Sequence, residues 1–416
     1  MGMNEALLKA TREQRALALA QSARIKKDGD LWIVPSQSMN AGSYIVRTSA
    51  DGTPCCTCPD WETRQLPCKH IIAVQYVRHE ITPPDAASLV EMKRPRYAPK
   101  PGYREARMNE KLVFVRLLHA LCAGVEQPAY KGGRPAYPLS DVLFAAGMKV
   151  FTTFSGERSN SDVVMGADLI EKEIGAKIKV PHPYTTLRIM RKPETADTIK
   201  RLIEESAKPL REVEVDFAID ATGISQSTYV RWFDKKWGKD RREKKWLKLH
   251  IMIGVTTLVV TGVEVTKGGR NDSPELPNLV GQTAKNFNMR EVSADKGYLA
   301  KKNFRAIVKT GAEPFIPFKD NSRQGCDELW NRLHAYFVLN KKDFLDKYHK
   351  RSKSECMFSS MKRVLHSSVR ARSSTGSVAE VYMKVLVHNI RMLVHSIYEL
   401  GIDPQFWLGE SKGAAE

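Results

Sequence analysis

The stretch Tyr348-His-Lys-Arg-Ser-Lys-Ser-Glu-Cys-Met-Phe-Ser-Ser-Met-Lys362 carries a phenol, two cations and a carboxylate at regular spacing: Tyr348, Arg351, Glu355 and Lys362. At about 100° per residue, an α-helix would place these four side chains within an arc of roughly 60°. A carboxylate flanked by cations favours a helix face that binds a metal ion and phosphate oxygens. A solvated face with a salt bridge would show the same pattern. The rest of the chain decides between the two.

The whole chain is long and basic. It has 416 residues, a formal net charge of +19 and a hydrophobic fraction of 42%, as expected for a globular protein of two to four domains. No apolar run is long enough to span a bilayer and no signal peptide opens the chain, so we expect no membrane partner and a cytoplasmic, nucleoid-associated protein. The charge indicates a polyanionic partner, nucleic acid before membrane, with solubility alone as the alternative.

Four of the seven cysteines are crowded into one short span near the N-terminus. Cys56-Thr-Cys58 is followed, after nine residues, by Cys68-Lys-His70. Three thiolates and one imidazole are a tetrahedral zinc set, although the adjacent Cys55 could replace Cys56 on spacing alone. The pattern resembles the SWIM zinc finger, which has Cys-x-Cys, a loop and then Cys-x-His after a short hairpin. The resemblance favours Cys56 and implies one structural zinc ion in a module that binds DNA or a protein.

The composition changes twice before the C-terminal half. Residues 81–104 carry five prolines among basic residues, which indicates an extended linker. From 105 to 208 apolar residues recur at helical spacing, and the basic stretch 183–192 fits a recognition helix. We therefore expect a helical DNA-binding domain after the linker.

From residue 212 the apolar residues alternate with period two. Val213, Val215, Phe217 and Ile219 predict a strand that reaches Asp220 before a turn at Ala221-Thr-Gly. The segments 249–255 and 258–265 predict a hairpin of buried strands, and Asp272 or Ser273 is expected to cap the helix that follows it. Strands are also predicted over 291–294, which leads into Asp295, and over 312–318.

A basic segment, Lys235-Lys-Trp-Gly-Lys-Asp-Arg-Arg-Glu-Lys-Lys-Trp246, separates the first strand from the hairpin. Lys244, Lys245 and Trp246 combine cations with an aromatic ring, a pattern typical of phosphate contacts beside stacked bases. A solvated loop is the alternative.

The predicted order is three strands, helix, strand, helix, strand and helix, with acids at Asp220, Asp295 and Glu355. This order resembles the RNase H-like core of DDE transposases, specifically the bacterial insertion-sequence group marked by Tyr-x2-Arg-x3-Glu-x6-Lys. That signature is complete in the opening stretch, and Asp295-Lys-Gly-Tyr matches the motif around the group's second aspartate. In this group the first aspartate is commonly followed by Ser or Thr and then Thr. Here Ala221 and Thr222 follow Asp220, so Asp216 on the same strand face is its rival.

The resemblance implies a DNA transposase that cleaves element ends and transfers the strand into target DNA by a cut-and-paste-type reaction. Two Mg²⁺ or Mn²⁺ ions would be held by Asp220 as the bridging ligand and by Asp295 and Glu355 as outer ligands. Arg351 and Lys362 would bind phosphates and Tyr348 would contact the cleaved strand. The partners would be double-stranded DNA, at the ends and the target, and a second subunit in a homodimer. A nuclease without strand transfer and a transposase-derived DNA-binding regulator are the alternatives.

The sequence thus predicts an α/β protein in five parts. A small α+β zinc finger module spans 1–80, and the linker spans 81–104. The helical DNA-binding domain spans 105–208, the RNase H-like catalytic domain 209–400, and a tail 401–416. A SWIM finger is not the usual N-terminus of this transposase group.

Overall fold

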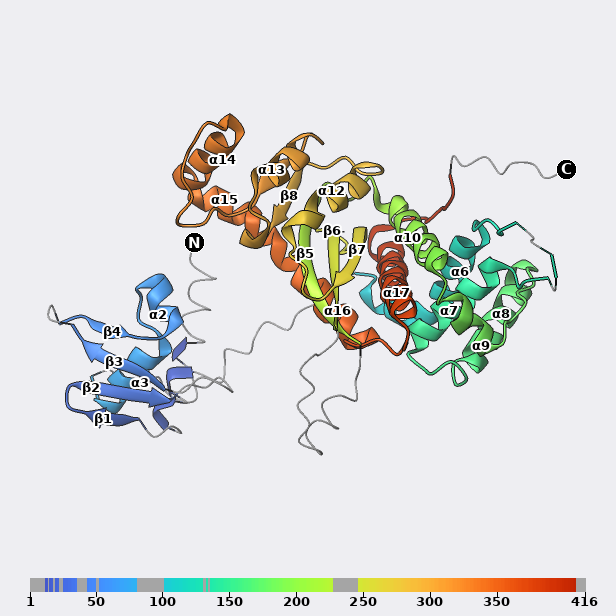
Figure 1. The fold of residues 1–416 in the computed structure, drawn as a ribbon. Helices are drawn as coiled ribbons and strands as arrows, with labels where there is room; N and C mark the ends of the chain where they lie inside the picture. The colour runs from blue at the N-terminus through green and yellow to red at the C-terminus, as the bar shows by residue number, and fades with distance from the viewer. Residues whose placement is uncertain are drawn as a thin grey trace. The chain divides into compact units, whose positions relative to one another are not determined.

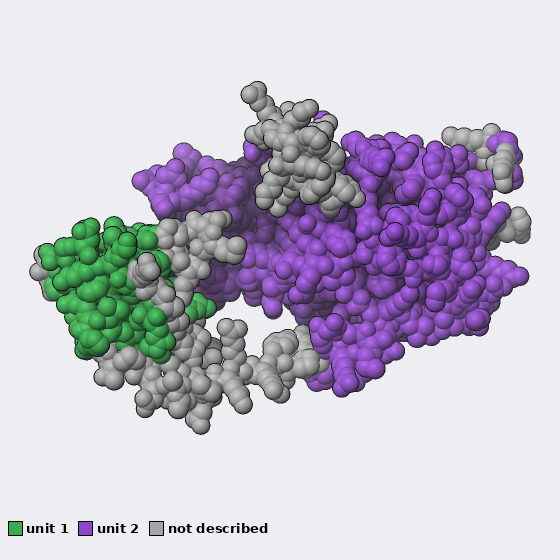
Figure 2. All heavy atoms as spheres, turned by 90° about the horizontal axis from the view of Figure 1, so that it is seen from below, with its two compact units in different colours: residues 1–98 green, residues 99–416 purple. Residues whose placement is uncertain are grey.

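The computed structural model describes most of the chain: residues 12–13, 15–17, 19–21, 25–35, 43–49, 52–80, 101–129, 132–133, 135–226 and 246–408. The chain forms two compact units, residues 1–98 and residues 99–416 (Figure 2). Most of the predicted linker, Lys244 and Lys245 with the rest of the basic segment before Trp246, and the end of the predicted tail lie outside the described residues. No helix in the described part is both long and apolar enough to cross a membrane.

The first unit is a four-stranded antiparallel sheet with two short helices. The strands follow in chain order, β1 (Lys26–Asp28), β2 (Leu31–Pro35), β3 (Ser43–Thr48) and β4 (Pro54–Cys56). The helices α2 (Pro59–Arg64) and α3 (Lys69–Val77) come next. Val34 and Val46 from the sheet pack with Ile71 and Val74 from α3 and with the cysteines, so the core of this small unit is built around the thiol cluster.

The second unit contains a mixed five-stranded sheet in the order β7-β6-β5-β8-β9 (Figure 1). β5 (Asp216–Ser225), β6 (Trp246–Gly254) and β7 (Val260–Lys267) are antiparallel, which confirms the predicted hairpin. β8 (Glu291–Ala294) pairs in parallel with β5, and β9 (Glu313–Phe315) pairs in parallel with β8. Three antiparallel strands followed by two parallel ones form the predicted RNase H-like core.

The turn predicted at Ala221-Thr-Gly is wrong, because β5 continues through it to Ser225. β5 is the central strand, paired with β6 along its length and with β8 over its first four residues. Continuous pairing with β6 through residues 221–223 overrides the local turn propensity of glycine. Gly223 instead makes room for a neighbour: a Cβ there would lie 3.2 Å from the indole of Trp246. Asp220 therefore lies within a strand rather than after it.

Helices cover the two faces of the sheet. α12 (Leu276–Ala284) packs on one face, where a Cβ on Gly262 would meet the Leu279 carbonyl oxygen at 2.8 Å. α13 (Lys301–Val308) packs beside α12 and β9. Helix α16 (Ser352–Leu365) lies against β5 (Figure 1), and its side chains bond to Asp220 and Thr222 of that strand.

The helical segment shares one core with the sheet. The long helix α17 (Ser374–Leu400) packs against the helical segment and against β7. Residues of both regions belong to a single buried cluster, so residues 99–416 form one compact unit. The helices of the segment are α5 (Tyr103–Met108), α6 (Glu110–Ala123), α7 (Leu139–Thr152), α8 (Asn160–Ile174), α9 (Pro183–Ile189) and α10 (Pro193–Ala207).

The opening stretch is not one uninterrupted helix, which corrects the expectation of a single helical stripe. It is divided into α15 (Lys341–Tyr348), the 3₁₀ turn η4 (His349–Arg351) and α16, and α15 is preceded by α14 (Glu328–Leu339). The Ser354 hydroxyl donates to the Arg351 carbonyl oxygen at 2.7 Å, a back-bond that bends helices. The tightened turn nevertheless keeps Tyr348, Arg351 and Lys362 directed at the sheet.

Candidate metal centre and candidate active site

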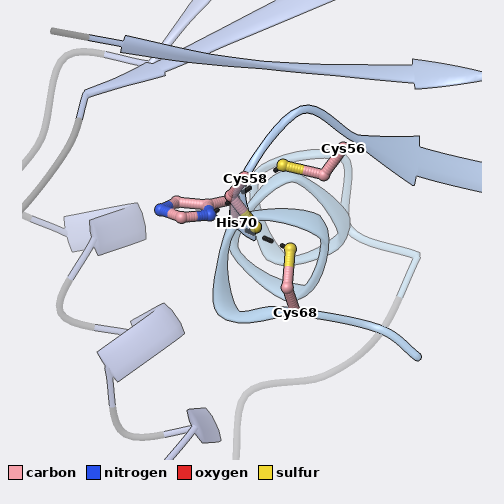
Figure 3. A group of neighbouring side chains, drawn as sticks. All are labelled: Cys56, Cys58, Cys68 and His70. Atoms are coloured by element: carbon pink, nitrogen blue, oxygen red, sulfur yellow. Dashed lines mark hydrogen bonds between the residues drawn. The ribbon is translucent and has the colours of Figure 1, made fainter. Parts of the chain in front are cut away.

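The four predicted zinc ligands form one buried cluster in the first unit (Figure 3). Cys56 ends β4, Cys58 and Cys68 are the N-cap residues of α2 and α3, and His70 lies in the first turn of α3. Their donor atoms all lie within 4.8 Å of one another, and His70 Nδ1 is 3.9 Å from Cys56 Sγ and 3.8 Å from Cys68 Sγ. Tetrahedral zinc separates sulfur and nitrogen ligands by about 3.6 Å. The donor set and its spacing fit Zn²⁺.

The cluster is also electrostatically prepared for a cation. The hydrogen bond to Cys56 lowers the pKa of Cys68, which favours the thiolate form of Cys68. The same hydrogen bond raises the pKa of Cys56, and burial raises that of Cys58. The Cys55 thiol instead donates to the Arg47 carbonyl oxygen at 3.4 Å and is not part of the cluster.

In the second unit, Asp220 stands in the middle of β5 and is held by α16 and its own backbone. Its Oδ1 accepts from the Ala221 amide at 2.8 Å. Its Oδ2 accepts from Arg351 Nη1 at 2.9 Å and from the Ser354 hydroxyl at 2.8 Å. Ser354 had no predicted role, although it lies three residues after Arg351 and so falls on the same helix face.

Arg351 joins Asp220 to Glu355. Its Nη2 donates to Glu355 Oε1 at 2.6 Å while Nη1 reaches Asp220. Burial would lower the pKa of Arg351, but the hydrogen bond to Glu355 and the charge of Asp220 raise it. One guanidinium group therefore links two of the three predicted acids, which come from different elements.

Asp295 comes next to Asp220 through strand pairing. Ile219 of β5 pairs with Ala294 of β8, so the two aspartates occupy the next position on neighbouring parallel strands. Asp295 Oδ1 accepts from the Lys296 amide at 2.7 Å and lies 3.5 Å from the Tyr348 hydroxyl. The stretch around Tyr348 thus reaches both aspartates, one through Tyr348 and the other through Arg351.

The three acids are spread more widely than the zinc ligands. Among the described residues, the Cys/His cluster is the only group of three or more such side chains whose donor atoms lie mutually within 4.8 Å. Glu355 is exposed, and the guanidinium of Arg351 stands between it and Asp220. Carboxylate oxygens are nevertheless the hard donors that Mg²⁺ and Mn²⁺ prefer, so the chemistry of the set fits these ions.

Lys362 extends the same face of the sheet. Its Nζ is 2.5 Å from the Thr222 hydroxyl, and Thr222 is two residues beyond Asp220 on the same side of β5. Burial lowers the pKa of Lys362. A cation therefore stands about 7 Å along the strand from the first aspartate.

Asp216, the rival of Asp220, belongs to a different cluster at the start of β5. Its carboxylate accepts two hydrogen bonds from Arg290, at 2.9 and 2.7 Å, and one from Lys350 Nζ at 2.8 Å. Lys350 also donates to Glu291, which pairs with Asp216 across β5 and β8. The Asp216 carboxylate is thus held by two cations. It lies four residues before Asp220 on the strand, which is about 13 Å away.

Two other predicted residues have structural surroundings. Asp272 makes no side-chain cap, and its carboxylate instead faces Lys248 and the buried ring of His250. Asp272 is the N-cap residue of the 3₁₀ turn η2 (Ser273–Glu275) that precedes α12, but its side chain pairs with Lys248 of β6 and does not cap the turn. Trp246 begins β6, and its indole packs over Gly223 and Gly268.

The sheet has the strand order and the mixed pairing of an RNase H-like core. Comparison with known protein families identifies two parts of the chain. Residues 212–390 match the family model described as a transposase DDE domain, and residues 45–78 match the SWIM zinc finger. The chain therefore contains a transposase DDE domain preceded by a SWIM zinc finger.

A solved piggyBac transposase synaptic complex with hairpin DNA aligns with 75% of this chain and 79% of that chain, at 10% identity and a TM-score of 0.33. No curated protein matches the chain.

Proposed function

We propose that this chain is an active DNA transposase that cleaves DNA at the ends of a mobile element and joins the freed ends to target DNA in a cut-and-paste-type reaction. One observation carries the proposal: Arg351 hydrogen-bonds both Asp220 and Glu355, while the register of β5 and β8 sets Asp295 beside Asp220. These contacts support a site formed by the three acids of the transposase signature, which come from three separate elements.

Two Mg²⁺ or Mn²⁺ ions, held by Asp220, Asp295 and Glu355, would activate the attacking oxygen and stabilise the leaving oxygen of the phosphodiester. Asp220 is the bridging ligand in this proposal, and Asp295 and Glu355 are the outer ligands. The backbone amides of Ala221 and Lys296 orient the two aspartates from behind, and Ser354 does the same for Asp220.

The remaining signature residues act on the DNA. Arg351 is a planar, bidentate donor that can exchange its carboxylate partners for phosphate oxygens. Lys362 supplies a further cation along β5, and Tyr348 lies beside Asp295, where it can contact the cleaved strand. Trp246, with Lys244 and Lys245, would add a stacking and phosphate contact.

The partners in this proposal are double-stranded DNA and a second copy of the chain, because two ends are joined in one event. The zinc finger module (1–80) holds one structural Zn²⁺, and the linker (81–104) connects it to a helical DNA-binding domain (105–208). The catalytic domain spans 209–400 and the tail 401–416. The basic net charge and the absence of a membrane-spanning helix among the described residues support action at the nucleoid.

The test is an end-cleavage assay on the full-length protein. The protein is incubated with Mg²⁺ and duplex DNA taken from the flanks of its own gene, and new 3′ ends and joined products are mapped. Glu355→Gln and Asp295→Asn are expected to abolish both products while duplex binding is kept. Asp346→Asn, an exposed acid on α15, is the matched control and should cleave like the parent chain.

Three outcomes separate the possibilities. Cleavage retained in either active-site variant would remove that residue from the site. Cleavage without joined products would leave a nuclease. Binding without any cleavage by the parent chain would leave a DNA-binding protein.

A further inference from the structure

The segment from residue 366 to 373 connects α16 to α17. It pairs with the last residue of the central strand β5, beyond the residues of β5 that pair with β8. The Ser225 amide donates to the Ser367 carbonyl oxygen at 3.0 Å, and the Val369 amide donates to Ser225 at 2.9 Å. Ser225 and Ser368 form a parallel bridge. The connection is therefore fixed to the far end of β5.

Two buried charged residues of α17 hold this segment from beneath. Lys384 Nζ donates to the carbonyl oxygens of His366 at 3.0 Å and Ser368 at 2.6 Å. The Glu380 carboxylate accepts from the amides of Arg370 and Ala371, both at 2.9 Å. Lys384 is 3% exposed and Glu380 is 7% exposed.

Burying these two charged side chains has a cost in folding free energy. Burial lowers the pKa of Lys384 to about 8, and an acid and a base inside a protein carry a desolvation penalty. Neither residue touches the predicted acids in the described contacts. Both are used to fix the backbone of one short connection.

The outer side of the segment is basic. Arg370 and Arg372 are exposed, and neither forms an ion pair with any residue in the described part of the chain. Arg191, at the end of the basic stretch singled out in the sequence, continues this surface. Its Cγ would lie 3.4 Å from a Cβ on Gly376, which follows the segment.

The distance from the candidate active site can be estimated along β5. Asp220 and Ser225 are five residues apart, which is about 17 Å in a strand. Lys362, bonded to Thr222, lies between them. At 3.4 Å per step of duplex DNA, 17 Å corresponds to about five base pairs.

We propose that the 366–373 segment is a phosphate-binding site for duplex DNA leaving the active site. Arg370 and Arg372, continued by Arg191, bind the backbone about five base pairs from the cleaved bond. The site rests on the proposed function for its substrate. Exposed arginines are common, but these are mounted on a backbone that two buried charges hold rigid, as a fixed phosphate contact requires.

The test measures the salt dependence of binding between the full-length protein and duplex DNA from the flanks of its own gene. Each lost phosphate contact lowers the slope of log K against log salt by about 0.9. For the double variant Arg370→Ala/Arg372→Ala, the magnitude of this slope should therefore be smaller by about two. Arg211→Ala, an exposed arginine before the opposite end of β5, is the matched control and should lose nothing.

A length series places the contact. On duplexes that end about three base pairs from the cleavage site the double variant should bind like the parent chain, and on duplexes about ten base pairs longer it should bind more weakly. An unchanged slope, or an equal loss at both lengths, overturns the proposal. If the parent chain binds with the expected difference but does not cleave, the phosphate site stands and the catalytic proposal fails.

A variant of Lys384, the buried lysine that bonds the backbone of the 366–373 segment, gives an independent check. Lys384→Met should weaken binding of the longer duplex while thermal unfolding shows that the chain is still folded. If the folded variant binds the longer duplex as tightly as the parent chain does, the support by Lys384 is not needed for DNA binding and the proposal is overturned.

Discussion

The thiol cluster and the acidic site both gather metal-binding side chains, but they gather them in opposite ways. The zinc ligands run from Cys56 to His70, and each lies at the end of a short element or in the first helical turn. The acids run from Asp220 to Glu355 and depend on a parallel strand pair and a distant helix. The first site is local in sequence, whereas the second exists only when the whole second unit is folded.

The two sites also differ in their neighbours. The thiol cluster is buried and consists of three cysteines and one histidine. The acidic site is partly exposed, and Arg351 and Tyr348 contact its carboxylates. A closed set of four ligands suits a permanent structural ion, whereas exchangeable cations beside acids suit a site that takes up a charged substrate. The predictions below test this contrast.

Zinc removal should give the largest effect. The first unit has few core residues apart from the ligands, and structural zinc contributes roughly 10 kcal/mol or more to such modules. Cys68→Ser, or a chelator, should unfold residues 1–98 and leave residues 99–416 folded, as followed by zinc analysis and limited proteolysis. Cys55→Ser is the control and should retain one zinc per chain. A chelated protein whose first unit still resists protease would show that zinc does not hold it together.

The next largest effect should distinguish variants of Asp220 from variants of Asp216. Asp220→Asn removes a charge that we place at the reacting phosphate, so end cleavage should fall by about a thousandfold or more, roughly 4 kcal/mol. Asp216→Asn loosens an ion-pair cluster with Arg290 and Lys350, so it should lower the melting temperature and retain cleavage. Cleavage assays and thermal unfolding on both variants decide the assignment. The reverse pattern would move the first acid to Asp216.

The difference in locality also explains what the sequence could predict. The zinc set and the signature from Tyr348 to Lys362 are short patterns, and each identified its residues directly. β8 with Asp295, and the hairpin of β6 and β7, followed from apolar runs that the sheet buries. These elements are governed by local spacing and burial.

Other features depend on partners far away in sequence. Pairing with β6 turned the expected turn after Asp220 into strand, and the indole of Trp246 explains Gly223. Asp272 faces a cation on β6 rather than a helix end. At the η4 break, Lys350 reaches two acids on β5 and β8. Spacing along one segment carries no information about such contacts.

Acid should weaken the second unit through a buried histidine. His388 of α17 is fully buried, its Nε2 lies 2.9 Å from the Leu258 carbonyl oxygen, and burial lowers its pKa to about 4. The His388 side chain takes up a proton near pH 6.5 in the unfolded chain but only near pH 4 in the folded chain. The neutral, buried histidine therefore makes its full contribution to folding stability above pH 6.5. This contribution should fall by about 3 kcal/mol between these values.

The comparison is chemical denaturation at several pH values on the parent chain and on His388→Asn, whose side chain does not titrate. Paired acids such as Asp216 lose stability at lower pH in both proteins, so the difference between the two curves isolates the histidine. Parallel curves from pH 7 to 4 would show that the histidine does not contribute.

The smallest effect should come from the residue that docks η4 on the sheet. Lys350 bonds Asp216 and Glu291 and directly precedes Arg351 in the turn, so Lys350→Met should cost about 1–2 kcal/mol of unfolding free energy. It should also lower the cleavage rate about tenfold with little change in DNA affinity, because Arg351 loses its fixed position. Lys347→Met is the control, since its Nζ stays 3.8–4.0 Å from Glu291, Glu313 and Asp343. Lys350→Arg should restore both values. A Lys350→Met protein that is destabilised but cleaves at the full rate would show that the acidic site tolerates movement of this turn, and that its geometry is set by the strands alone.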